Sequence, residues 1–76
     1  MPHKPPTVNL RKFLIAYREE ASPLGDLARD VRDDPKFPRG KCLLTTYEDY
    51  LWRLDACYEA EVALKKAFAL ALSLTA

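Results

Sequence analysis

The chain contains little glycine, cysteine or histidine. Among 76 residues there are two glycines, two cysteines and one histidine, and no phosphate-binding loop, metal-ligand spacing or nucleophile elbow appears. Cys42 and Cys57 have neither a Cys-x-x-Cys spacing nor a neighbouring histidine, which excludes the usual zinc and thioredoxin-type sites. A disulfide between them is the open alternative, but we favour free thiols because small disulfide scaffolds usually carry more bridges.

Groups suited to catalysis are equally scarce. The only histidine, His3, lies in a proline-rich lead-in, and adjacent acids such as Asp33 and Asp34 point to different sides of a helix. A catalytic nucleophile, acid or base must instead be held close to its partner in a pocket. The sequence therefore predicts that the protein is not an enzyme and that it has no metal, no cofactor and no small-molecule substrate.

Long hydrophobic runs are absent as well. The most apolar stretch, residues 67–76, has ten residues and follows the last charged residue, Lys66, whereas a membrane span needs about twenty residues. No apolar segment of a signal peptide follows Met1. We therefore expect no membrane contact and a cytoplasmic location.

The composition is that of a single globular domain. Apolar residues make up 49% of the chain and charged residues 30%, which supplies enough apolar surface to offset the entropy lost on folding. Three prolines within the first six residues disfavour a helix there. We therefore predict a flexible lead-in over residues 1–7 and one helical domain over residues 8–76.

Apolar residues recur at helical spacing in the first half of the chain. Four of them predict a helix over residues 8–20, namely Leu10, Phe13, Leu14 and Tyr17. The next helix is expected from Pro23 to Asp33, because Ser22 can cap its free amides and proline has no amide to lose at the first position. Its predicted apolar face consists of Leu24, Leu27, Ala28 and Val31.

Two prolines interrupt the chain after this second helix. Pro35 and Pro38 bracket Phe37 and hold the backbone extended, so we expect Phe37 to plug the core from a loop. Residues 42–44 are expected to form one short turn. No strand pattern is visible in the sequence.

Two further helices are predicted in the second half. Thr45 and Glu48 fit a capping box, although Thr46 is an equally good cap. We predict a bend near Asp55 and a final helix over residues 56–74. The expected fold is therefore all-α, a compact bundle of four to five short helices. Its predicted shared core consists of Leu14, Leu27, Phe37, Tyr50, Leu51 and Phe68.

The central segment resembles a known family. The run Ser22–Pro38 combines an acidic helix end with a Phe-Pro pair, and the motif Tyr47-x-x-Tyr50-Leu51 follows it. Together they are similar to the YozE family of small bacterial proteins, which has a sterile-alpha-motif-like (SAM-like) fold. The resemblance covers residues 8–70. It implies a bacterial, cytoplasmic helical bundle with no known catalytic residues.

Charges are unevenly distributed along the chain. Residues 1–18 carry four basic residues and no acid, residues 19–34 carry six acids against two arginines, and residues 36–41 carry three basic residues and no acid. If the first helix lies beside the 36–41 loop, we expect a phosphate-binding patch there. Its candidate residues are Arg11, Lys12, Arg18, Lys36, Arg39 and Lys41. A net charge of +1 is low for a nucleic-acid binder, so this hypothesis ranks second.

Three apolar residues are candidates for partner binding. Trp52 lies off the centre of the third helix's core stripe, so it either covers the fourth helix, which we favour, or stands exposed as an interface anchor. Leu70 and Leu74 lie on a different face of the last helix from Leu64 and Phe68, so they cannot share its core. Beside Trp52 they would form an apolar patch, which predicts self-association through the last helix.

These features predict a small interaction module that binds a protein partner or a second copy of itself as a homodimer. A nucleic-acid-binding accessory protein is the second hypothesis. The third is an inhibitor encoded by a mobile element, which would present the acidic stretch to a basic enzyme surface. Salt dependence separates the first two, because binding to nucleic acid weakens steeply as salt rises.

Overall fold

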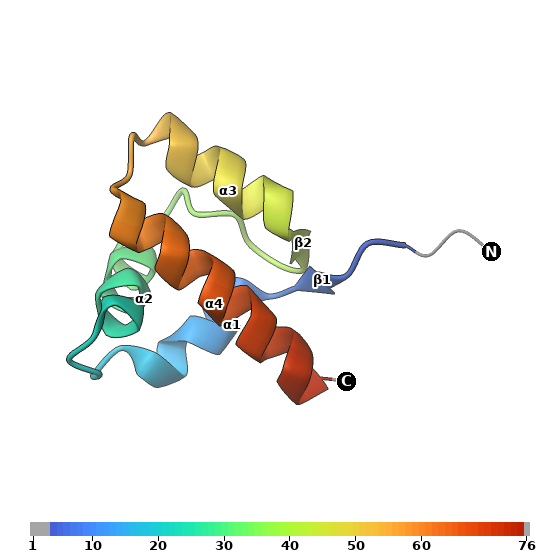
Figure 1. The fold of residues 1–76 in the computed structure, drawn as a ribbon, viewed down its shortest axis with the longest axis horizontal. Coiled ribbons are helices and arrows are strands. Elements are labelled where there is room, and N and C mark those ends of the chain that lie inside the picture. Colours follow the sequence, from blue (N-terminus) through green and yellow to red (C-terminus); the bar gives the residue numbers. More distant parts are fainter. Residues whose placement is uncertain (1–3, 76) are drawn as a thin grey trace.

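A computed structural model describes residues 4–75, so His3 lies outside the described part of the chain. This part contains four α-helices, one 3-10 helix and a two-stranded antiparallel sheet (Figure 1). The elements are β1 (Thr7–Val8), α1 (Leu10–Leu14), η1 (Ile15–Tyr17), α2 (Pro23–Asp33), β2 (Cys42–Leu43), α3 (Leu44–Arg53) and α4 (Tyr58–Thr75). The predicted bundle of four to five short helices is confirmed, with a small sheet added to it.

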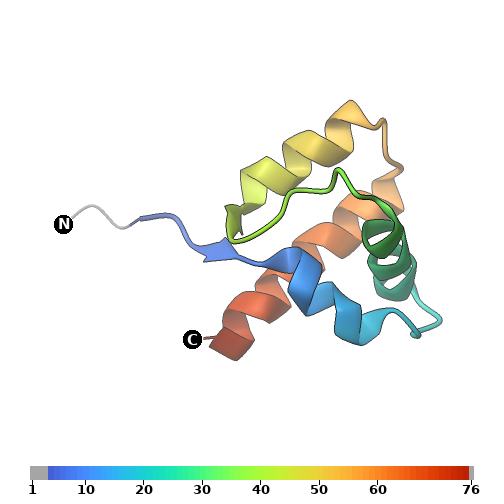
Figure 2. The ribbon, with the colours of Figure 1, turned by 180° about the vertical axis from the view of Figure 1, so that it is seen from behind.

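The longest helix, α4, holds the bundle together. It contacts α1, α2, α3 and β1, and both views show α3 on one side of it and α1 with α2 on the other (Figures 1 and 2). Its buried residues are Ala63, Leu64, Ala67, Phe68 and Ala71. Five of the six predicted core residues are buried, namely Leu14, Leu27, Phe37, Leu51 and Phe68. The sixth, Tyr50, is half-buried against this core.

The first helix is shorter than the predicted segment of residues 8–20. Its N-terminus is capped by Asn9, whose side chain accepts a hydrogen bond from the Lys12 amide at 3.2 Å. The α-helix ends at Leu14, and a single 3-10 turn, η1, follows it. Beyond η1, carbonyl groups of the chain bond to α2 instead of continuing a helix, which is why the apolar spacing overestimates the helix length.

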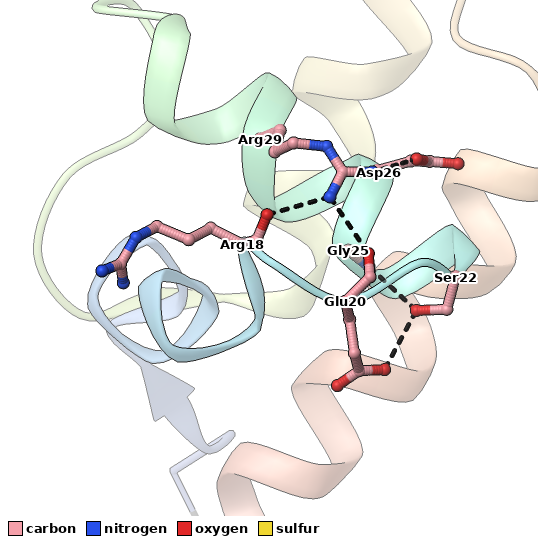
Figure 3. A network of polar contacts seen from close by, with 6 residues as sticks. All are labelled: Arg18, Glu20, Ser22, Gly25, Asp26 and Arg29. Carbon is pink, nitrogen blue, oxygen red and sulfur yellow. Dashed lines mark hydrogen bonds and ion pairs between the residues drawn. The ribbon is translucent and has the colours of Figure 1, made fainter.

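The connection between η1 and α2 is held by one arginine of α2 (Figure 3). The Nη1 atom of Arg29 donates to the Arg18 carbonyl at 2.9 Å and to the Glu20 carbonyl at 3.0 Å. The same guanidinium forms an ion pair with Asp26. Because a side chain satisfies these carbonyls, the chain can leave the helix without losing hydrogen bonds.

The second helix begins where the sequence predicts. Pro23 is its first residue, and the Ser22 hydroxyl accepts a hydrogen bond from the Gly25 amide at 3.1 Å. The same hydroxyl donates to the Glu20 carboxylate at 3.0 Å, so the cap also ties down the preceding connection (Figure 3). Three of the four predicted apolar residues are buried, and Leu24 is half-buried.

A two-residue antiparallel sheet replaces the turn predicted over residues 42–44. Thr7 pairs with Leu43, and Val8 pairs with Cys42. Strands of two residues are too short to show an alternating pattern, which is why the sequence reveals no strand. The pairing brings the N-terminal segment beside the start of α3 (Figure 2).

The connection between α2 and β2 passes between α1 and α3 (Figure 2) and is anchored by one aromatic ring. Phe37 is 2% exposed and stacks on Tyr47 with 5.3 Å between the ring centroids. Tyr50 meets the Phe37 ring edge-on, at a centroid distance of 5.6 Å. The prediction that Phe37 plugs the core is confirmed.

Arg11 holds the same connection from the α1 side. Its guanidinium donates to the main-chain carbonyl of Val31 at 3.1 Å, to that of Phe37 at 3.2 Å and to that of Asp34. It also lies over the Phe37 ring, 5.7 Å from the centroid. Carbonyls at a helix C-terminus lack partners within the helix and carry partial negative charge. Arg11 therefore caps the C-terminus of α2.

Tyr47 joins three segments through its hydroxyl group. The side chain is buried, with 0% exposure, and its hydroxyl donates to the Val8 carbonyl at 2.6 Å and accepts from the Leu10 amide at 3.1 Å. The Gly40 carbonyl lies 3.2 Å from the same oxygen. Burial raises the pKa of Tyr47 to about 12, because a phenolate here would lose its hydration.

Stability should therefore fall at alkaline pH. An unfolded tyrosine loses its proton near pH 10, whereas folded Tyr47 keeps its proton up to a pKa of about 12. The stabilising contribution is complete below pH 10 and is lost as the pH rises through 12. We expect a loss on the order of 2–3 kcal/mol across this interval, measured by urea unfolding at several pH values.

A Tyr47→Phe variant is the control for this pH dependence. It should be less stable than the wild type at pH 8, because the Leu10 amide and the Val8 carbonyl lose their partner. It should also lose less stability between pH 8 and pH 12. Equal pH dependence in both proteins would contradict the role assigned to Tyr47.

The capping box predicted for the third helix is absent. Leu44 begins α3 directly after β2, and no side-chain hydrogen bond caps the helix. Thr45 and Thr46 are both exposed inside the helix, and Glu48 forms an ion pair with Lys65 of α4 at 3.7 Å. The strand pairing just before α3 sets its start and overrides the capping preference of threonine.

The third helix ends in a Schellman motif, and the bend predicted near Asp55 is confirmed. The Asp55 amide donates to the Trp52 carbonyl at 3.0 Å, and the Ala56 amide donates to the Leu51 carbonyl at 3.1 Å. Asp55 has a φ of 56°, in the left-handed region that favours glycine. α4 begins at Tyr58, later than the predicted start at residue 56.

Replacing Asp55 with glycine should stabilise the protein. Glycine adopts the left-handed conformation without the strain that a Cβ atom causes, and it is the preferred residue at this position of the motif. We expect a gain of about 0.5–1 kcal/mol in the free energy of unfolding, measured by urea denaturation. Asp55→Ala keeps the Cβ atom and should give no gain. A stabilised alanine variant would instead assign the effect to the carboxylate.

Candidate interaction surfaces

Exposed apolar side chains are concentrated where α3 turns into α4. The large apolar side chains exposed among the described residues are Ile15, Trp52, Leu54, Tyr58, Val62 and Leu74. Four of these six fall within residues 52–62, which cover the end of α3, the connecting turn and the start of α4 (Figure 1). We name this group, Trp52, Leu54, Tyr58 and Val62, the apolar corner.

The side chains of the apolar corner are unusually exposed for their size. Trp52 is 76% exposed and Tyr58 is 78% exposed. Both are large aromatic side chains, a type that is usually mostly buried. The four side chains come from one short segment, residues 52–62. Single exposed apolar residues are normal on soluble proteins, whereas several that form one patch commonly mark a site of association. The corner is therefore the leading candidate for a binding surface.

The predicted partner-binding residues belong to different surfaces. Trp52 is exposed, so the favoured expectation that it covers the fourth helix is wrong. Leu74 is 70% exposed, but it lies near the opposite end of α4, about 24 Å along the helix axis from Tyr58. Leu70 is half-buried. The contiguous patch expected from Trp52, Leu70 and Leu74 is therefore not formed.

Sequence reasoning missed Tyr58 and Val62, although a signal for them was present. Around α4 they lie about 120° and 160° from the buried Leu64. Two apolar residues one turn apart on the outer side of a helix favour a binding role over a core role. The early part of the last helix, and not its end, carries this signal.

Two of the six predicted phosphate-binding residues serve the fold. Both terminal nitrogens of Arg11 donate to main-chain carbonyls around the end of α2. Arg18 donates to the Ile15 carbonyl of its own turn at 2.7 Å, and its main-chain carbonyl accepts from Arg29. Arg11 is therefore occupied, and the exposed Arg18 guanidinium bonds to a carbonyl of its own turn.

The other four basic residues stay candidates for phosphate binding. Lys12 and Lys41 line the same hollow, so the first helix and the 36–41 loop do lie side by side, as that hypothesis requires. Lys36 and Arg39 are exposed on the same loop. The patch is smaller than the predicted one.

Residues 4–75 contain no group of three or more histidine, cysteine, aspartate or glutamate side chains that could hold a metal ion. Cys42 in β2 and Cys57 just before α4 are free thiols. None of the helices in the described part of the chain has both the length and the apolar character needed to cross a membrane.

A groove follows the seam between α2 and α4. Its first hollow is lined by Glu20, Ser22, Pro23, Leu24, Tyr58, Glu59, Val62, Ala63 and Lys66. A second hollow shares Pro23 and Glu59 with the first and also includes Asp26 and Asp30. We name the two hollows together the α2–α4 groove. Tyr58 and Val62 belong both to this groove and to the apolar corner.

A family model described as YozE SAM-like fold matches residues 12–70, from α1 into α4. This match covers well over half of the chain. The chain belongs to the YozE SAM-like fold family. The resemblance seen in the Ser22–Pro38 run is thus confirmed, and the helical bundle is the fold expected for a YozE-family protein. No curated protein and no solved structure matches the chain significantly.

Proposed function

We propose that this YozE-family chain is a non-catalytic helical module of the bacterial cytoplasm that binds a protein partner through the apolar corner. The observation that carries the proposal is the exposure of four large apolar side chains within residues 52–62. Tryptophan and tyrosine, both present in the corner, are enriched at the energetic centres of protein interfaces.

The rigidity of the elements that carry the apolar corner supports a binding role. Trp52 and Leu54 lie at the end of α3, where the Schellman motif fixes the backbone, and Tyr58 and Val62 lie on the first turns of α4. Anchors held on rigid elements lose less conformational entropy on binding than anchors on mobile loops. The corner therefore offers preorganised apolar surface to a partner.

Affinity capture from cells that produce the protein, followed by mass spectrometry, tests the proposal. The wild-type chain should retain a protein that a Trp52→Ser, Tyr58→Ser double variant retains at least tenfold less. The matched control, Ile15→Ser with Leu74→Ser, removes two exposed apolar side chains outside the corner and should keep the partner. All four positions are exposed, so these substitutions should leave the fold intact.

Unchanged capture by the corner variant would contradict the proposal. Sedimentation of each variant across a concentration range shows whether the partner is a second copy of the chain. A dimer that the corner variant loses would make the apolar corner a homodimer interface. A dimer that only a Leu70→Glu, Leu74→Glu variant loses would instead assign self-association to the end of α4.

Phosphate binding is the second candidate function, because Lys12 and Lys41 line one hollow. Anisotropy of labelled duplex DNA and of single-stranded RNA should then increase with protein at low salt, and the affinity should fall steeply as salt rises. A Lys12→Ala, Lys41→Ala variant should bind about tenfold more weakly. No binding at 50 mM salt would exclude this function.

A further inference from the structure

We infer that the α2–α4 groove receives a basic amphipathic helix of the partner protein. The inference rests on the proposed function, because the groove and the apolar corner share Tyr58 and Val62. It adds the chemical character of the partner, which the exposure of the corner alone does not give.

The floor of the groove is apolar, and the groove is long enough for about two turns of a docked helix. Leu24 and Ala63 lie at its base, half-buried and buried respectively, and Pro23 and Val62 form its exposed walls. The α4 residues that line it, Tyr58 to Lys66, extend over about 12 Å, which matches about two turns of a docked helix. Such a helix inserts apolar side chains at positions i, i+3 or i+4, and i+7.

The rim of the groove is acidic. Its carboxylates belong to Glu20, Asp26, Asp30 and Glu59, whereas its only lysine is Lys66. Figure 3 shows Glu20 and Asp26 on either side of the start of α2. All four acids are exposed, so a partner with lysine or arginine beside its apolar anchors would gain attraction at both edges.

Contacts within the chain neutralise only part of this charge. Asp26 pairs with Arg29, and Asp26 and Glu59 lie in the first turns of helices, whose positive ends offset some of their charge. Asp30 lies outside these turns and forms no ion pair with any described residue. Even when Arg29 is counted together with Lys66, the rim of the groove carries four acidic side chains and only two basic ones.

A second copy of the chain does not meet this description. The basic amphipathic helix of the chain is α1, which carries Arg11 and Lys12. Its apolar residues Leu10 and Leu14 are 0% exposed in the core of the folded protein. A folded copy therefore cannot insert them into the groove, so we assign the occupant to another protein.

Two synthetic peptides of about 18 residues test the inference on the 76-residue chain. Both carry leucine at the anchor positions, and the remaining positions are lysine-rich in one and glutamate-rich in the other. Titration into the ¹⁵N-labelled chain should shift the amide signals of Leu24, Tyr58 and Val62 with the lysine peptide. The glutamate peptide should bind at least tenfold more weakly.

Charge variants make the test specific to the groove. An Asp30→Asn, Glu59→Gln variant should bind the lysine peptide at least fivefold more weakly than the wild type. The control variant, Asp33→Asn with Asp49→Asn, makes the same change in net charge at exposed positions outside the groove. It should bind within twofold of the wild type.

Three results would overturn the inference. They are equal affinity for the two peptides, no binding of the lysine peptide, and shifts confined to residues outside the groove. In each case the proposed function is tested separately, by whether the corner variant loses the protein that the wild type captures. The corner variant could lose the captured partner while both peptides bind the wild type equally well. The apolar corner would then be a binding surface, but one that does not prefer basic helices.

Discussion

Gly25→Ala is expected to destabilise the protein by about 3 kcal/mol, although alanine is the better helix former by about 1 kcal/mol. A Cβ atom at this third residue of α2 would lie 1.9 Å from the Glu20 carbonyl oxygen and 2.7 Å from its carbonyl carbon. Both are main-chain atoms, so no side-chain rotation relieves the overlap. The connection can yield only by breaking the bonds that Arg29 makes to the Arg18 and Glu20 carbonyls.

Asp30→Ala is the matched control for this substitution. It introduces alanine in the same helix at an exposed position, where changes usually stay within about 0.5 kcal/mol. Urea unfolding of the three proteins gives the comparison directly. If the Gly25→Ala variant is as stable as the wild type, the Glu20 carbonyl must lie farther from residue 25 than the structure places it.

Phe37→Ala is expected to cost about 3–5 kcal/mol, the range for removing a buried aromatic ring. The ring is 2% exposed, stacks on Tyr47 and meets Tyr50 edge-on. A domain of 76 residues is stable by about 4–11 kcal/mol in total. The variant should therefore be largely unfolded or have a melting temperature lower by more than about 10 °C.

Phe37→Leu separates the packing of the ring from the position of the loop. Leucine fills much of the same volume, and Arg11 still donates to the main-chain carbonyl of residue 37, so the loss should be about 1–2 kcal/mol. A loss below about 1 kcal/mol for the alanine variant would show that the loop contributes little to the core.

Sequence reasoning succeeded where a local rule decides the structure. Ser22 followed by Pro23 starts α2 because capping and the missing proline amide act within one turn. Phe37 is buried because prolines on both sides keep it out of a helix and leave its ring to the core. The bend at Asp55 was predicted without a glycine, and the structure places this aspartate in the left-handed conformation.

Predictions failed where the outcome depends on a partner distant in the sequence. Arg11 faces the end of α2 because carbonyl groups twenty or more residues away need donors, and no local pattern shows this. The start of α3 follows the pairing of β1 with β2, which joins segments about 35 residues apart. Leu74 and Trp52 were predicted to form one patch because both are apolar and off the core faces of their helices. In the structure they lie near opposite ends of α4.

Site-specific photo-crosslinking inside the producing cell tests the central claim most directly. The photoreactive residue p-benzoylphenylalanine replaces Tyr58 in one variant and Leu74 in another, and both side chains are exposed at opposite ends of α4. The proposal of a docking surface at the apolar corner predicts one discrete protein adduct from position 58 and none from position 74. An adduct from position 74 with none from position 58 would contradict it.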